Sequence, residues 1–343
     1  MGPGEETDTP VIPTISLDKA PRVFGGHYYS DNQGNWYYKD ANGKNLIGLN
    51  FVDNIPVYFD KDGKQVKGRF AEDGRYFDKD SGALVTKRYL ETEDGNWVYV
   101  NDKGDKLKGE QTIDGVKVYF DDFTGIQVKG HFAPNGKYYD KDSGALATNQ
   151  YIIAYNPYRH RNERYYVNDQ GIWLTGPQTI DGKQVYFDKY EGCQVFDNFG
   201  DDGYFYDQDG NRVDLGANRY VQIRDNWYYV GNDGKILTGE HIIDGAHVYF
   251  EYSGEQVKGD FDYKNQFHDK DSGNLVTNRF VTVNDKTYFI GADSKAIKGA
   301  TVIDNIEYFF DEKTGAQVKG NFASNKKYYN STTGALVINS YVQ

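Results

Sequence analysis

Residues 118–130 read Val-Tyr-Phe-Asp-Asp-Phe-Thr-Gly-Ile-Gln-Val-Lys-Gly, and this stretch decides the fold because its frame recurs along the chain. The glutamine of the frame stands at Gln65, Gln127, Gln194, Gln256 and Gln317, at spacings of 62, 67, 62 and 61 residues. A second marker, the glycine that closes the preceding segment, stands at Gly48, Gly109, Gly176, Gly239 and Gly299. Two markers with nearly the same period indicate that one supersecondary unit was duplicated, so the sequence predicts an array of five repeats.

Each repeat divides into three aromatic segments, each followed by a turn that contains glycine. In the second repeat these segments begin at Trp97, Val118 and Lys137. Aromatic and β-branched residues followed by Asp/Asn-x-x-Gly are hairpin signals, because glycine supplies the positive φ that the turn needs. Isolated hairpins are unstable in water, so the hairpins must stack. The sequence therefore predicts an all-β fold, a β-solenoid of about fifteen stacked β-hairpins in five repeats of three.

The ends of the chain differ from the repeats. Residues 1–21 are rich in Thr and Pro and are expected to be a linker, and residues 22–343 are expected to form the array. The chain stops at Tyr341-Val342-Gln343, where another first-segment strand begins, which suggests an array cut from a longer one.

Composition excludes several classes of function. The formal net charge of −12 argues against nucleic acid and anionic membranes as partners. No apolar run approaches 18 residues, so no membrane span is expected, and the single cysteine, Cys193, cannot form an intrachain disulfide. We expect a monomer that binds a neutral ligand.

The chain shows no constellation typical of catalysis. Its 51 acidic residues lie mostly in Asp-Lys-Asp-Gly turns, which Asx hydrogen bonding explains, and every candidate carboxylate pair is repeated. The segment 207–211 is similar to a calcium loop but lacks the distal acidic ligand. We therefore expect no catalytic residues, no metal site and no cofactor.

The second segment carries the candidate binding residues. If Asp62 and Gly63 form a two-residue turn, Phe59 and Val66 share the core face, and Tyr58 shares the other face with Gln65 and Lys67. One interpretation of the repeated Gln-x-Lys pair is a solvated strand edge. The other is a sugar site, because an aromatic ring covers the apolar face of a pyranose while an amide and an ammonium bind its hydroxyls.

At these residues the sequence resembles the glucan-binding repeats of bacterial glucansucrases, the dextransucrase-type enzymes of lactic acid bacteria and oral streptococci. The resemblance covers about residues 22–343 and implies secretion, a β-solenoid, and binding of α-glucan such as dextran and isomaltooligosaccharides. It implies no catalytic domain in this chain. The sugar-binding residues that it implies are Gln65, Lys67, Gln127, Lys129, Gln256, Lys258, Gln317 and Lys319, with aromatic platforms among Tyr37, Tyr58, Tyr99, Tyr119, Tyr229 and Tyr249.

Two alternatives remain open: a choline- or cell-wall-binding repeat module, and a spacer without a ligand. Choline sites need cages of several aromatics, and four tryptophans are too few for fifteen hairpins.

The third repeat departs from the pattern. Phe196 replaces the lysine, Arg164 replaces the tryptophan of the first segment, and residues 156–161 form an insertion. We expect its site to be altered or inactive.

Overall fold

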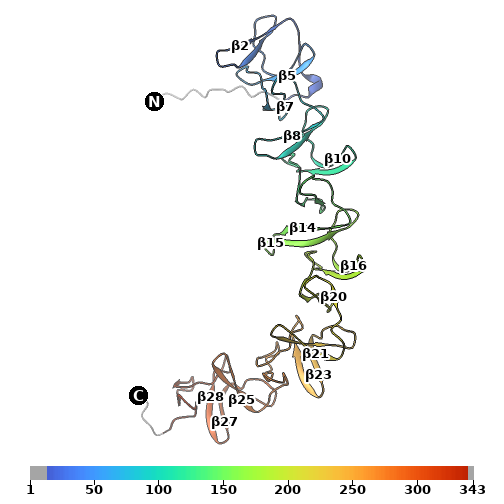
Figure 1. Ribbon diagram of the computed structural model, residues 1–343. Helices are drawn as coiled ribbons and strands as arrows, with labels where there is room; N and C mark the ends of the chain where they lie inside the picture. Colours follow the sequence, from blue (N-terminus) through green and yellow to red (C-terminus); the bar gives the residue numbers. More distant parts are fainter. Residues whose placement is uncertain (1–13, 339–343) are drawn as a thin grey trace, which may run out of the picture. The chain divides into compact units, whose positions relative to one another are not determined.

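In the computed structural model, which describes residues 14–338, the chain folds as successive β-hairpins (Figure 1). Within these residues the only helical element is the short 3₁₀ turn η1 (Leu17–Lys19). The chain divides into two compact halves between Leu174 and Thr175, and each half is described by itself below. The all-β class and the repetition of hairpins are confirmed.

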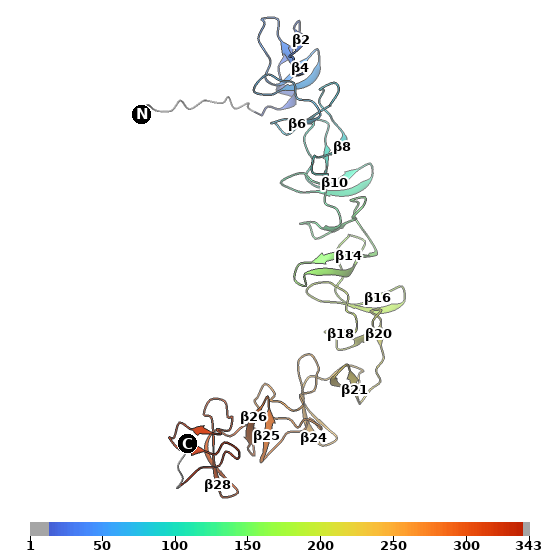
Figure 2. The same cartoon turned by 60° about the vertical axis from the view of Figure 1, so that its left-hand side comes forward.

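The first hairpin of every repeat joins two strands of four to seven residues (Figure 2). These pairs are β2 (His27–Ser30) with β3 (Trp36–Lys39), β8 (Arg88–Glu91) with β9 (Trp97–Val100), β14 (Gln150–Asn156) with β15 (Arg161–Val167), β21 (Arg219–Ile223) with β22 (Asn226–Val230), and β25 (Arg279–Val283) with β26 (Lys286–Ile290). The insertion of the third repeat lengthens β14 and β15, which makes this hairpin the longest of its class.

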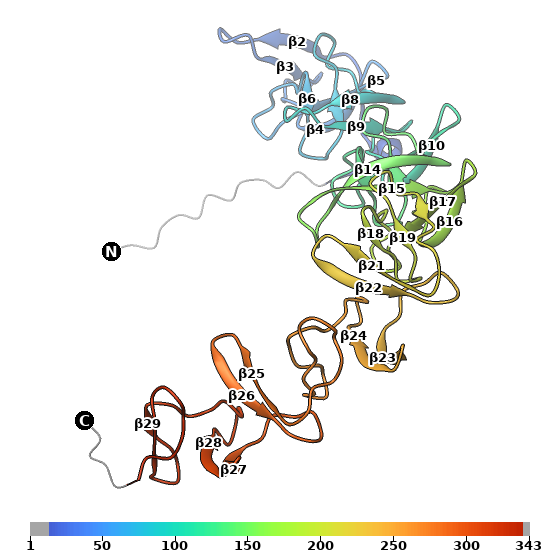
Figure 3. The same cartoon turned by 60° about the horizontal axis from the view of Figure 1, so that its bottom comes forward.

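The second hairpin always pairs two five-residue strands. These are β4 (Gly48–Val52) with β5 (Ile55–Phe59), β10 (Gly109–Ile113) with β11 (Val116–Phe120), β16 (Gly176–Ile180) with β17 (Lys183–Phe187), β23 (Gly239–Ile243) with β24 (Ala246–Phe250), and β27 (Gly299–Ile303) with β28 (Ile306–Phe310). Figure 3 shows β16 beside β17 and β23 beside β24.

The third hairpin is shorter. It consists of β6 (Arg69–Phe70) with β7 (Tyr76–Phe77), β12 (His131–Phe132) with β13 (Tyr138–Tyr139), β18 (Asn198–Phe199) with β19 (Phe205–Tyr206), and β29 (Asn321–Phe322) with β30 (Tyr328–Tyr329). In the fourth repeat this hairpin is reduced to a single bridge between Phe261 and Phe267. Two further strands extend sheets: β20 (Arg212–Val213) pairs with β19, and β1 (Arg22–Val23) runs parallel to β4.

The strand pairing of the second hairpin corrects the sequence-based prediction. We expected the aromatic strand to pair with the Gln-x-Lys segment that follows it. It does so through the bridge between Phe59 and Gln65, but its longer pairing is with the strand that precedes it, from Gly48 in the first repeat. The connecting residues Asp53 and Asn54 have φ of 49° and 69°. Two successive positive φ angles are typical of a type I′ turn, whose twist matches that of the flanking strands.

The predicted turn after the aromatic strand is one residue longer than expected. The amide of Asp60 donates to the carbonyl oxygen of Lys64, and Phe59 rather than Asp60 lies opposite Gln65. The same bridge joins Phe120 to Gln127, although that turn contains one more residue. The Asp60 and Asp121 carboxylates cap their own turns through Oδ1, so the frame tolerates both lengths.

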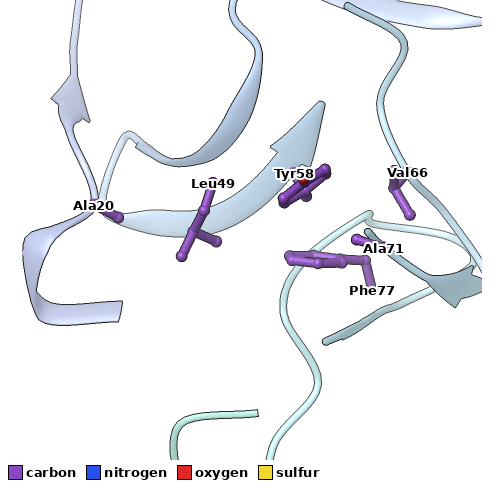
Figure 4. Close-up of a cluster of buried hydrophobic side chains, with 6 residues drawn as sticks. All are labelled: Ala20, Leu49, Tyr58, Val66, Ala71 and Phe77. Carbon is purple, nitrogen blue, oxygen red and sulfur yellow. The ribbon is translucent and has the colours of Figure 1, made fainter. Parts of the chain in front are cut away.

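The core consists of small clusters between hairpins. In the first, Tyr58, Val66 and Phe77 pack with Leu49, Ala71 and Ala20 (Figure 4). Ile15 and Leu17 pack against this cluster, so the last residues of the expected linker are part of the packed structure, and residues 1–13 lie outside the described chain. A second cluster holds Phe59, Val57, Val52 and Tyr38.

Successive hairpins are joined through their backbones. The amide of Gln65 donates to the carbonyl oxygen of Trp36 over 2.7 Å, and the amide of Leu84 donates to that of Pro56 over 2.8 Å. The second repeat has the same two bonds, from Gln127 to Trp97 and from Leu146 to Lys117. The segment after each turn thus hydrogen-bonds to the preceding hairpin, which places its side chains beside those of that hairpin.

Candidate functional site

The glutamine of the repeated frame lies against a glycine of the turn after the third hairpin. A Cβ atom at Gly82 would stand 2.3 Å from Nε2 of Gln65, and this glycine has a φ of +71°. The other four repeats show the same approach within 2.2–2.4 Å, between Gln127 and Gly144, Gln194 and Gly210, Gln256 and Gly273, and Gln317 and Gly334. No side chain fits at this position while the glutamine stays in place.

The lysine two residues later connects this turn to a tryptophan. Nζ of Lys67 donates to the carbonyl oxygen of Asp80 over 2.9 Å and lies 5.6 Å from the centroid of the Trp36 ring. Lys129 and Lys258 make the same bond and lie 5.9 Å and 5.2 Å from the rings of Trp97 and Trp227. Each of these lysines therefore borders an indole face in a cation–π contact.

These groups line an open groove in the first repeat, with a volume of about 350 Å³. Its walls include Tyr28 and Trp36 from the first hairpin, Asp53 from the tip of the second, and Gln65 and Lys67. Trp36 is 43% exposed, so part of its ring is accessible to a ligand beside the Lys67 ammonium. The groove thus offers one flat apolar face, one phenol, one carboxylate, one amide and one ammonium.

The tyrosine of the groove is a hydrogen-bond donor at neutral pH. Partial burial, followed by the neighbouring Tyr38 and Asp53, raises the pKa of Tyr28 above its ordinary value. Tyr89 and Tyr220 have raised pKa values through burial and the corresponding carboxylates Asp114 and Asp244. The second and fourth repeats therefore place a tyrosine near an aspartate at the positions that correspond to Tyr28 and Asp53.

The buried end of the glutamine side chain is common to four repeats. Nε2 of Gln65 and of Gln127, and Oε1 of Gln194 and of Gln256, are buried without a hydrogen-bond partner among the described residues. A buried polar atom without a partner costs about 1–3 kcal/mol. Because Gln194 belongs to the repeat that lacks the lysine, this state is shared by complete and incomplete sites and does not by itself indicate binding.

Two of the predicted platforms are wrong. Tyr58 and Tyr119 are only 1% and 5% exposed and belong to the core, where they contact Phe77 and Tyr139. Burial raises the pKa of Tyr58 to about 12. The physical reason is the longer turn, because a shift of one residue moves Gln65 from the face of Tyr58 to the opposite one.

The other predicted tyrosines lie beside the groove or away from it. Tyr37 follows Trp36 in β3 and so faces the other side, where it stacks on Tyr29 at 5.1 Å. Tyr99 and Tyr229 are half-buried and support Tyr89 and Tyr220 through edge-to-face contacts at 5.0 and 4.9 Å. Tyr249 is half-buried against Tyr263.

The exposed aromatic residue beside the glutamine and lysine, which the sequence did not single out, is tryptophan. Trp36, Trp97 and Trp227 precede the glutamines of their repeats by 29, 30 and 29 residues, and this nearly constant offset was the signal that could have found them.

The comparisons with known proteins agree with this architecture. The family model described as "Choline-binding repeat" matches residues 46–89, 107–151, 237–280 and 297–341, which together are more than half of the chain. The chain belongs to the choline-binding repeat family.

Its relatives in sequence include streptococcal glucosyltransferases. The chain is 39% identical to Glucosyltransferase-S of Streptococcus mutans serotype c over 76% of its own length, and 34% identical to Glucosyltransferase-I of the same organism over 92%. It spans only 18% and 22% of these relatives. The chain therefore corresponds to a part of these glucosyltransferases, which confirms the predicted resemblance to glucansucrase repeats.

Among solved structures, the modular autolysin LytC of Streptococcus pneumoniae matches 79% of this chain and 52% of its own, with 19% identity and a TM-score of 0.37. The family match places the chain among repeat modules of the choline-binding type. In the described residues no helix is long and apolar enough to cross a membrane.

The choline-binding repeats of this chain are not equivalent. In the fifth repeat Thr287 stands in the place of tryptophan and Phe280 in the place of the groove tyrosine, and Nζ of Lys319 lies 3.5 Å from the Thr287 hydroxyl. In the third repeat Phe196 reaches within 2.9 Å of the Cβ position of Gly210, where other repeats have the lysine chain. The family match also skips residues 152–236. The full set of groups is present in the first, second and fourth repeats.

Acidic side chains in the turns are occupied by backbone hydrogen bonds. Oδ1 of Asp207, in the segment similar to a calcium loop, accepts from the amides of Asp209 and Asn211 over 3.0 and 2.8 Å. Among residues 14–338 there is no group of three or more His, Cys, Asp or Glu side chains that could hold a metal ion.

Proposed function

We propose that this chain is a non-catalytic module that holds an extracellular α-glucan of the dextran type in the grooves of its first, second and fourth repeats. The observation that carries the proposal is the groove that combines an open tryptophan face with a tyrosine, an aspartate, a glutamine and a lysine. The C–H face of a pyranose stacks on the indole, and the polar groups around it satisfy the ring hydroxyls. We further propose that the hairpins of each half stack as a β-solenoid.

The charge of the chain supports a neutral polymer. With a net charge of −12, anionic cell-wall polymers would be repelled over long range, whereas a neutral glucan is not affected. The sequence relatives, which are glucosyltransferases, support the same substrate class.

Because the chain belongs to the choline-binding repeat family, choline is the second candidate ligand. Choline recognition requires a cage of aromatic faces around a quaternary ammonium. In these grooves the lysine ammonium already lies 5.2–5.9 Å from the centroid of each tryptophan ring. A second cation would meet a like charge at that face, so the groove favours a neutral sugar over choline.

Affinity electrophoresis in gels that contain dextran tests the proposal. The wild-type chain should be retarded, and the triple variant W36A/W97A/W227A should be retarded far less. Gln194→Ala, in the repeat that lacks the lysine, is the matched control and should migrate as the wild type does. Retardation of the triple variant equal to that of the wild type, or release of the wild type by choline but not by isomaltooligosaccharides, would contradict the proposal.

A further inference from the structure

The fourth repeat contains a groove that Trp227 does not line. It lies between the β23–β24 hairpin and the third hairpin of the repeat, and its volume is about 450 Å³. Glu240, His241 and His247 from the strands and Gln266 and His268 from the third hairpin line it.

In the second and fifth repeats the corresponding space is crossed by a tyrosine. The hydroxyl of Tyr139 donates to Glu110 over 2.9 Å, and that of Tyr329 donates to Glu307 over 3.0 Å. Lys137 and Lys327 bind the same carboxylates over 2.7 and 3.1 Å. In these two repeats the third hairpin is thereby fastened to the second.

In the fourth repeat His268 stands at the position of this tyrosine, but it hydrogen-bonds within its own hairpin. Its Nε2 lies 3.2 Å from Oδ2 of Asp262, within the same hairpin. Asp262 occupies the position of Ala71 and Ala133 in the first two repeats. The imidazole therefore does not make the hydrogen bond to the second hairpin that the tyrosine makes in the other two repeats, and a groove remains between the two hairpins.

The third repeat supports this explanation. The hydroxyl of Tyr206 donates to Asp202 of its own hairpin over 2.8 Å, and the corresponding groove has a volume of about 390 Å³. There, however, the guanidinium of Arg212 covers the Tyr204 ring at 3.3 Å and binds Gln184, so polar groups of the walls bind each other.

The pair in the fourth repeat is fixed and buried. The side chains of His268 and Asp262 are 2% and 1% exposed. Nδ1 of His268 lies 2.9 Å from the carbonyl oxygen of Gly273, and the amides of Lys264 and Gln266 donate to Oδ1 of Asp262. Replacing both partners of a buried hydrogen bond by apolar groups is often nearly neutral or stabilising, so stability alone does not explain why this repeat departs from Ala and Tyr.

We propose that this groove is a second saccharide site, which takes a glucosyl unit of the polymer; the inference rests on the proposed function. Its walls carry a carboxylate, an amide and two imidazoles that can bind vicinal hydroxyls, beside the apolar side chains of Ile242 and Leu275. The groove is larger than that of the first repeat, which the proposed function assigns to sugar. The Glu240 carboxylate is balanced by Lys264 at 2.5 Å, so the site suits a neutral ligand.

The test follows the imidazole NMR signals of His241 and His247 in the full chain during titration with isomaltotriose. These signals should move in the wild type. In D262A/H268Y, which restores the Ala and Tyr of the second repeat, they should stay unchanged, because the tyrosine closes the groove. Gln266→Ala, which keeps the buried pair, should require about three- to tenfold more sugar for the same movement, as expected for one lost hydrogen bond.

Tryptophan fluorescence, recorded in the same titrations, separates the two hypotheses. The double variant should keep the fluorescence response and a wild-type melting temperature within a few degrees, which shows that it is folded. If the fluorescence responds in the wild type while the two histidines do not, the second site is overturned and the proposed function stands. If neither responds to isomaltotriose or to dextran, the proposed function itself fails.

Discussion

At the scale of single residues, the groove depends on the close contact between Gln65 and Gly82. The amide needs the space that any Cβ at position 82 would occupy, and the same glycine also has a left-handed backbone. Two separate requirements, one steric and one conformational, therefore act on one residue. They can be separated because Gly74 also has a positive φ, of +84°, but has open space around it.

We expect Gly82→Ala and Gly74→Ala to lower the free energy of unfolding by similar amounts, about 1–2 kcal/mol each, because both place alanine in the left-handed region. Only Gly82→Ala should also weaken dextran binding, since its methyl group displaces the glutamine. Urea unfolding and affinity electrophoresis of the two variants check this. Equal loss of dextran binding in both would show that backbone strain, not displacement of Gln65, is responsible.

Differences between repeats are also decided by single residues. Thr287 removes the flat face and Phe280 removes the hydroxyl in the fifth repeat, while Gln317 and Lys319 remain. The Gln-x-Lys pair alone therefore does not define a complete groove.

At the scale of the hairpin, an ion pair holds two elements of the second repeat together. Glu110 of β10 accepts from Lys137 and Tyr139 of the third hairpin. The hydrogen bond from Lys137, followed by that from Tyr139, lowers the pKa of Glu110 below its ordinary value of 4.5. A carboxylate whose pKa is depressed in the folded state stabilises that state above the unfolded pKa, and this contribution is lost as pH falls through the folded pKa.

The melting temperature should therefore fall between pH 5 and pH 3 by more in the wild type than in Glu110→Gln, which has no carboxylate to protonate at this position. At pH 7 the variant should be the less stable protein. Differential scanning calorimetry across this range checks both statements, with Glu93→Gln, at an exposed turn, as the control. Parallel pH profiles of the wild type and Glu110→Gln would contradict the assigned role of Glu110.

The hairpin is also the scale at which prediction from sequence succeeded and failed. The periods of Gln65 and Gly48 were sufficient for the array and its all-β class, because they depend only on spacing. The faces were not predictable, because they depend on whether the turn contains two residues, with Lys61 opposite Lys64, or three, with Asp60 opposite Lys64. A shift of one residue moves Gln65 from the face of Tyr58 to the opposite face. Trp36 was missed because it belongs to another hairpin, and the contacts that bring it beside Gln65 and Lys67, the backbone bond from Gln65 and the cation–π contact of Lys67, are tertiary.

At the scale of the whole molecule, the grooves are repeated along a chain that is covalently continuous. A polymer held in one groove is at high effective concentration for the next groove that it can reach, and avidity can exceed single-site affinity by roughly 10²–10⁴. The expected consequence is a contrast between long and short ligands.

Replacing Trp36, Trp97 and Trp227 by alanine one after another should reduce dextran binding steeply, by roughly tenfold or more per groove. Binding of isomaltotriose should instead fall in proportion to the number of grooves left. Isothermal titration with both ligands measures the two trends. Proportional loss for dextran as well would mean that a single polymer does not occupy several grooves.

The groove of the first repeat draws all its groups from one span, from Tyr28 to the turn at Gly82. A gene segment that encodes one repeat therefore encodes a complete pocket, and unequal recombination between such segments adds or removes pockets in whole numbers. An extra copy is at first redundant, and it can drift without harm to its neighbours. The fifth repeat, with Thr287 and Phe280, has the substitutions expected of such a drifting copy. The fourth repeat, with Asp262 and His268, has the substitutions expected of a copy in which drift led to the proposed second site.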